Sequence, residues 1–158
     1  MKKLNIFILF LIASCSTTST IDQINETNIS KSYQLNNLNV LNKTGKEYEN
    51  IDIVVLMNKS MNKALMSTDD SSILDQSNLK ILIVQYEEGN AFGRWLAPGL
   101  GKTVLSVETS LEDLSGNVLL QSQVTRSVGA GGGFTIGAWE EVFNDVAEQI
   151  VEDFSLYK

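Results

Sequence analysis

Apolar and polar residues alternate along two segments in the second half of the chain, which is the pattern of half-buried β-strands. Residues 103–112 and 118–125 both show this two-residue period. Between them, residues 113–117 contain Ser, Gly and Asn, which readily adopt turn conformations. We therefore predict a hairpin here. Residues 79–86 read LKILIVQY, apolar on both faces, and are expected to form a central strand.

Three further elements follow from the pattern. Residues 33–41 alternate as in a short strand, and residues 135–154 carry one apolar stripe at helical spacing. Residues 48–65 are ambiguous, because apolar residues recur at three- and four-residue intervals whereas the β-branched cluster 51–55 favours a strand. We predict a helix, because this pattern is longer than a typical strand.

The expected order is therefore strand, helix, strand, strand, strand, helix. It predicts an α+β fold: one two-layer domain over residues 33–158, with an antiparallel-rich four-stranded sheet and two helices on one face.

The N-terminus has the layout of a secretory signal peptide. Lys2 and Lys3 precede an apolar run that ends near Ala13, and this run is too short for an ordinary transmembrane helix. The small residues before Cys15 resemble a bacterial lipobox, so we predict a signal peptide over 1–14 and lipid attachment at Cys15. An ordinary cleavage site is the alternative. Residues 15–32 are polar and are expected to form a lipidated, flexible tether.

Composition and charge restrict the partners. The chain of 158 residues has 43% hydrophobic residues and a net charge of −7, which is typical of a globular domain and disfavours nucleic acid as a partner. The predicted lipid makes the membrane the first partner. Ser16 stands where aspartate would retain an enteric-type lipoprotein in the inner membrane. We therefore expect the periplasmic face of the outer membrane if the cell is Gram-negative.

The residue types needed for common catalysis are scarce. The chain has no histidine and one cysteine, Cys15, so histidine-based triads are excluded and a zinc site would need carboxylates alone. The stretch APGLGKT, 97–103, ends like a phosphate-binding loop, but it lacks the first glycine and leads into a strand instead of a helix. Residues 69–75 are acidic without the spacing of a calcium loop. We expect no cofactor, no metal and no enzymatic activity.

One glycine-rich loop, 89–101, carries Phe92, Arg94 and Trp95, which are residue types enriched at binding hot spots. These three residues are the candidate surface for a protein partner or a ligand. The alternative, which we favour, is that Phe92 and Trp95 cover the core beneath their own loop.

The glycines from Gly93 to Gly101, the alternating strand, the 113–116 turn and the sequence GAGGGFTIGAW before the last helix resemble the exported bacterial family called domain of unknown function 4410. The resemblance covers about residues 33–157 and implies a small α+β domain, with no catalytic residues to carry over. We expect a lipid-anchored, non-catalytic envelope protein that binds or assembles with another envelope protein, or self-associates. A small-ligand or glycan-binding lipoprotein is the first alternative, and a carboxylate-dependent hydrolase is the second.

Overall fold

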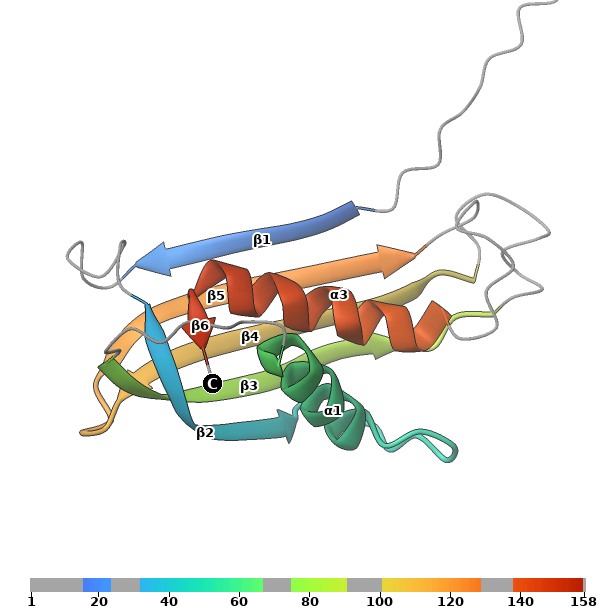
Figure 1. The fold of residues 1–158 in the computed structure, drawn as a ribbon. Coiled ribbons are helices and arrows are strands. Elements are labelled where there is room, and N and C mark those ends of the chain that lie inside the picture. Colours follow the sequence, from blue (N-terminus) through green and yellow to red (C-terminus); the bar gives the residue numbers. More distant parts are fainter. Residues whose placement is uncertain (1–15, 24–31, 67–74, 91–100, 129–137, 158) are drawn as a thin grey trace, which may run out of the picture.

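The described residues form one six-stranded mixed sheet with two helices on one of its faces (Figure 1). The computed structural model describes residues 16–23, 32–66, 75–90, 101–128 and 138–157. In chain order the elements are β1 (Ser16–Gln23), β2 (Tyr33–Asn42), α1 (Ile53–Met66), β3 (Asp75–Glu87), β4 (Thr103–Asp113), β5 (Val118–Val128), α3 (Ala138–Asp153) and β6 (Leu156–Tyr157). The strand order across the sheet is β1-β5-β4-β3-β2-β6.

The predicted α+β class, the order of elements and the two helices on one face are confirmed. β3, β4 and β5 pair antiparallel, as the hairpin prediction requires, and β3 lies in the middle of the sheet. β2 runs parallel to β3. A parallel pair needs a crossover connection, and α1 supplies it.

Two strands at the sheet edges extend the predicted four. β6 is a two-residue strand that pairs with Tyr33 and Gln34 of β2. β1 occupies Ser16–Gln23, part of the expected tether, and pairs antiparallel with β5 along its whole length. Its sequence, STTSTIDQ, lacks an apolar alternation, so periodicity did not indicate it. Its backbone bonds to β5 make it a strand all the same.

The ambiguous segment 48–65 forms helix α1 from Ile53 onward, and not a strand. A hydrogen-bonded cap stabilises its first turn. The Asp52 carboxylate accepts hydrogen bonds from the backbone N–H groups of Val54 and Val55, both at 3.0 Å. Such a cap satisfies donors that a helix start otherwise leaves unpaired. The helix then buries one stripe: Ile53, Met57, Ser60, Met61, Ala64 and Leu65.

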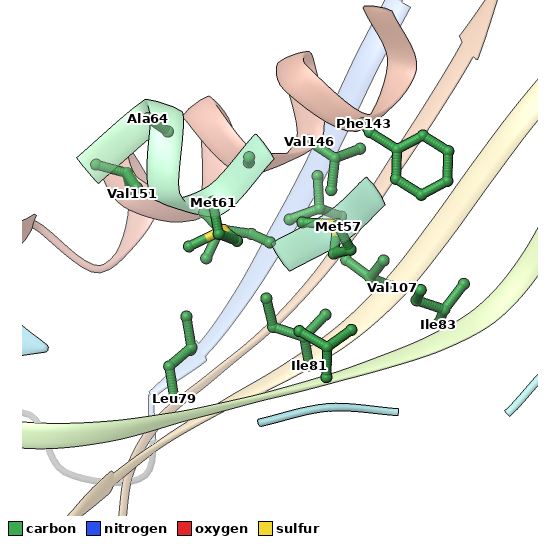
Figure 2. Packing of buried hydrophobic residues seen from close by; sticks show 14 of the residues in the cluster. Met57, Met61, Ala64, Leu79, Ile81, Ile83, Val107, Phe143, Val146 and Val151 are labelled. Atoms are coloured by element: carbon green, nitrogen blue, oxygen red, sulfur yellow. The ribbon is translucent and has the colours of Figure 1, made fainter. Parts of the chain in front are cut away.

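The core lies between this stripe, the apolar stripe of α3 and the inner face of the sheet. Figure 2 shows Met57 and Met61 of α1 pointing toward Ile81 and Val107, with Phe143 and Val146 of α3 beside them. All six side chains are fully buried. The apolar stripe predicted for residues 135–154 therefore packs into the core.

Polar side chains join α3 to β5 at the border of this core. The Arg126 Nε atom lies 2.7 Å from a carboxylate oxygen of Asp145. Further along, the Ser122 hydroxyl donates to Asp153 at 3.2 Å, and Gln149 donates to the same carboxylate at 2.8 Å. These contacts fix α3 along β5. Neither described helix is long and apolar enough to cross a membrane.

Candidate functional site

One end of the sheet gathers the segments that the sequence analysis singled out. β1 begins there at Ser16, which stands opposite Ser127 near the end of β5. β4 begins beside it, since Thr103 stands opposite Val128. β3 ends at the same place, and α3 starts nearby (Figure 1). We call this the Ser16 end of the sheet.

Cys15 lies outside the described residues, but its position along the chain is informative. It is bonded to Ser16, the first residue of β1, and consecutive Cα atoms are about 3.8 Å apart. The lipidation prediction itself is untested by the structure. A group attached to Cys15 would, however, be held within one residue of a paired strand.

Phe92, Arg94 and Trp95 also lie outside the described residues, so their role stays a prediction. The base of their loop is described. The backbone N–H of Asn90 donates to the carbonyl oxygen of Gly101 at 3.1 Å. This bond closes the loop at the end of the β3–β4 hairpin, and the loop therefore leaves from and returns to the Ser16 end.

Gly89 is needed at this loop base. It has φ +76, and a Cβ atom built on it would lie 2.6 Å from the Thr103 hydroxyl oxygen and 2.8 Å from the Gly101 carbonyl oxygen. The Thr103 hydroxyl donates to the carbonyl oxygen of Glu88 at 2.7 Å. Gly89 and Gly101 both have positive φ, a conformation that glycine adopts without steric cost.

The sheet face opposite the helices carries polar residues beside the apolar Leu82 and Val118. Lys80 and Glu108 are exposed on it, and a hollow of about 230 Å³ is lined by these two residues together with Glu112 and Gln121. The hydroxyls of Ser106 and Thr125 are hydrogen-bonded at 2.8 Å across β4 and β5 on this face. The period of two had indicated polar positions here, including Glu108 and Glu112, and no described helix covers them, as the predicted two-layer arrangement implies.

A second hollow, of about 400 Å³, lies between α1 and α3 and was not indicated by the sequence. Lys59, Lys63 and Glu140 line its rim, and Phe143 lies among its lining residues. The Ser60 hydroxyl bonds to the Asn144 side-chain oxygen at 3.0 Å. The Lys59–Glu140 pair, at 3.9 Å, joins two largely exposed side chains. These contacts join the two helices to each other.

Two described residues with shifted pKa values, Tyr86 and Asp113, lie in the core and in a turn, respectively. Burial raises the pKa of the Tyr86 hydroxyl to about 12, with the nearby Glu88 and Tyr48 adding to the effect. Hydrogen bonds from Asn117 and the turn backbone lower the pKa of Asp113. Within the part of the chain that the structure describes, no group of three or more Cys, Asp or Glu side chains is placed to hold a metal ion.

The fold and this arrangement define a small α+β domain whose described helices cover one face of the sheet. The chain belongs to the family described as Domain of unknown function (DUF4410), which matches residues 20–132. The predicted resemblance is thereby confirmed. The match starts within β1 and ends before α3.

Solved structures with a similar fold have low sequence identity. A PelC dodecamer from Paraburkholderia phytofirmans aligns with a TM-score of 0.57 at 12% identity, over 90% of this chain and 100% of that one. A DUF330 protein from Xanthomonas campestris aligns with a TM-score of 0.54 at 11% identity, over 78% of this chain and 83% of that one. At these identities the similarity concerns the fold. No curated protein matches the chain.

Proposed function

We propose that this protein is a lipid-anchored, non-catalytic protein of the cell envelope whose domain acts by assembly, with further copies of itself or with another envelope protein. The observation that carries the proposal is the start of β1 at Ser16, directly after the lipobox cysteine. A lipid on Cys15 would attach the folded sheet itself to the bilayer. Two or three acyl chains anchor stably, since each buried CH₂ contributes about 0.8 kcal/mol.

The same observation orients the domain. With a single residue between lipid and β1, the Ser16 end of the sheet would face the bilayer surface. The Phe92–Trp95 loop leaves from that end, and Trp is a residue type enriched at the membrane–water interface. Ser16 itself supports the periplasmic face of the outer membrane in a Gram-negative cell.

Two observations support assembly as the mode of action. The similar PelC structure is a dodecamer, and it aligns over nearly the whole of both chains. The helix-free face of the sheet and its edges offer backbone and polar groups for contacts. A non-catalytic role is supported by the absence of histidine from the sequence.

Metabolic labelling with an alkyne fatty acid tests the anchor. The wild-type chain, the Cys15→Ala variant and a Ser16→Ala control are expressed in the same bacterial cells, and the membrane fractions are analysed. We expect label and membrane association in the wild type and the control, and loss of both in Cys15→Ala. Persistent label in Cys15→Ala would refute the anchor.

Amine crosslinking in intact cells, followed by affinity purification, tests assembly. The proposal expects discrete species larger than the monomer, either multiples of this chain or a complex with one envelope protein, and their loss in Cys15→Ala. A protein that stays monomeric and captures nothing would contradict assembly, and ligand binding would then become the better hypothesis.

A further inference from the structure

The sheet ends in two edges of different kind. β1 lies at one edge, and its side away from β5 has no strand partner among the described residues. At the other edge, β6 pairs with β2 only through Tyr33 and Gln34. The rest of that side of β2, from Leu35 to Asn42, has no described strand partner. Each edge therefore presents backbone N–H and C=O groups for pairing.

Neither edge carries a lysine or a proline, two residues that often prevent a sheet from adding a strand. Natural edges are blunted by lysine, proline, bulges or short length. β1 reads STTSTIDQ, with Asp22 as its one charged residue and no proline. The open part of β2 reads LNNLNVLN, with no charge and no proline, and its one register shift lies at its start, between Leu35 and Asn37. Each open stretch is eight residues long.

We propose that these two edges pair with each other between copies of the chain, so that β1 of one protomer adds to the open side of β2 of the next. This inference rests on the self-association proposed above and names its surface. The occupant of each edge is thus a second copy, which carries a complementary strand of equal length.

The strand directions fix the sense of the pairing. β1 is antiparallel to β5, β5 to β4 and β4 to β3, while β2 is parallel to β3, so β1 and β2 run in opposite directions within one chain. A rotation about an axis roughly along the strands preserves these directions in the neighbouring copy. The new pair is therefore antiparallel, and the sheet continues from one protomer to the next.

Pairing of unlike edges is a heterologous contact. It leaves one free β1 and one free β2 edge after each addition, so it continues into a ring where the rotation closes and into an open filament where it does not. An isologous contact of β1 with β1 of a second copy would instead stop at a dimer and leave both β2 edges open. The two modes therefore predict different products.

Disulfide crosslinking in membranes of cells that express the full chain distinguishes them. Thr18 and Thr20 of β1 stand opposite Thr125 and Gln123, and Asn37 and Asn39 of β2 stand opposite Asn78 and Lys80. Four double variants combine Thr18→Cys or Thr20→Cys with Asn37→Cys or Asn39→Cys. Together the double variants test several registers of the β1–β2 pair. In all of these registers the two edges overlap along most of their length.

Such a disulfide cannot form within one chain. β1 and β2 are separated by three strands, so about four inter-strand spacings, roughly 19 Å, lie between them. Bridged Cα atoms are at most about 7 Å apart. The wild type, whose one cysteine is Cys15, and the four single variants serve as controls.

We expect at least one double variant to give a ladder of dimers, trimers and larger species on a non-reducing gel. The corresponding single variants should stay monomeric, and co-expression of a β1 single with a β2 single should give dimers only. Dimers from a β1 single variant alone would overturn the proposal in favour of β1–β1 pairing. Amine crosslinking of the same membranes tests self-association separately from the β1–β2 contact. Amine-crosslinked oligomers without any disulfide ladder would refute the β1–β2 contact and leave self-association standing. Monomers in both assays would refute the contact and self-association alike.

Discussion

The Tyr48 hydroxyl donates a hydrogen bond to the backbone carbonyl oxygen of Tyr86 at 2.9 Å, and the two rings meet edge to face with centroids 5.1 Å apart. Tyr86 in turn packs against Phe143 of α3. This contact joins the segment before α1 to the end of β3. The Tyr86 hydroxyl, by contrast, is buried with no hydrogen-bond partner among the described residues.

The two hydroxyls should therefore respond differently to removal. Tyr48→Phe loses a hydrogen bond and should lower the free energy of unfolding by about 0.5–1.5 kcal/mol. Tyr86→Phe removes a buried, unpartnered polar atom and should leave stability unchanged or raise it. Urea denaturation of both variants checks this pair, and a larger loss in Tyr86→Phe would contradict it.

Alkaline pH should act on Tyr86. Its pKa is raised from 10.0 to about 12 in the folded state. Because the folded protein holds this proton more tightly than the unfolded chain, the stability is complete below pH 10 and is lost as the pH rises from 10 toward 12. Denaturation of the wild type and Tyr86→Phe across this interval should show a shallower decline in the variant. Parallel curves would contradict the assignment.

Gly89→Ala should destabilise more than Gly116→Ala. Both glycines have positive φ, so both substitutions carry the strain of a left-handed conformation, about 1 kcal/mol. A Cβ atom at Gly89 also collides with Thr103 and Gly101, whereas nothing lies within 4 Å of one at Gly116. Thermal melting of both variants should place the Gly89→Ala midpoint clearly lower. Equal midpoints would contradict the close packing at the loop base.

Asp145→Asn should cost about 1–3 kcal/mol, because it leaves the guanidinium of Arg126, whose side chain is 15% exposed, without its anion. Glu140→Gln is the matched control, since the Lys59–Glu140 pair is longer and far more exposed. Exposed pairs contribute about 0–1 kcal/mol. Chemical denaturation of both variants measures the difference, and a greater cost for Glu140→Gln would refute the ranking.

Acid titration should single out Asp113. Its carboxylate accepts hydrogen bonds from the backbone of Ser115 and Asn117 and from the Asn117 side chain, all at 2.8 Å, which lowers its pKa below 3.8. This contribution to stability is present above pH 3.8 and is lost as the pH falls through the lowered pKa. NMR titration of the carboxyl should find the lowered pKa, and Asn117→Ala should bring it back up. An Asp113 that titrates at its ordinary value would contradict the turn geometry.

The sequence by itself determined the elements whose pattern is set by burial. β4, β5 and α3 each place apolar residues at the period of their own backbone, because the same face must meet the core along its length. The helix α1 was predictable for the same reason, although its β-branched first turn favours a strand. The Asp52 cap stabilises the helical start. β3 was predicted instead from a run that is apolar on both faces.

The tertiary structure decided what depends on pairing. β1 has no burial pattern, and its strand conformation comes from backbone bonds to β5, more than a hundred residues away in some pairs. The parallel sense of β2 follows from the α1 crossover. The gathering of Ser16, Gly89 and Thr103 at one end of the sheet, and the two unlike open edges, follow from strand order. Strand order is set by contacts between distant segments, and no local period encodes it.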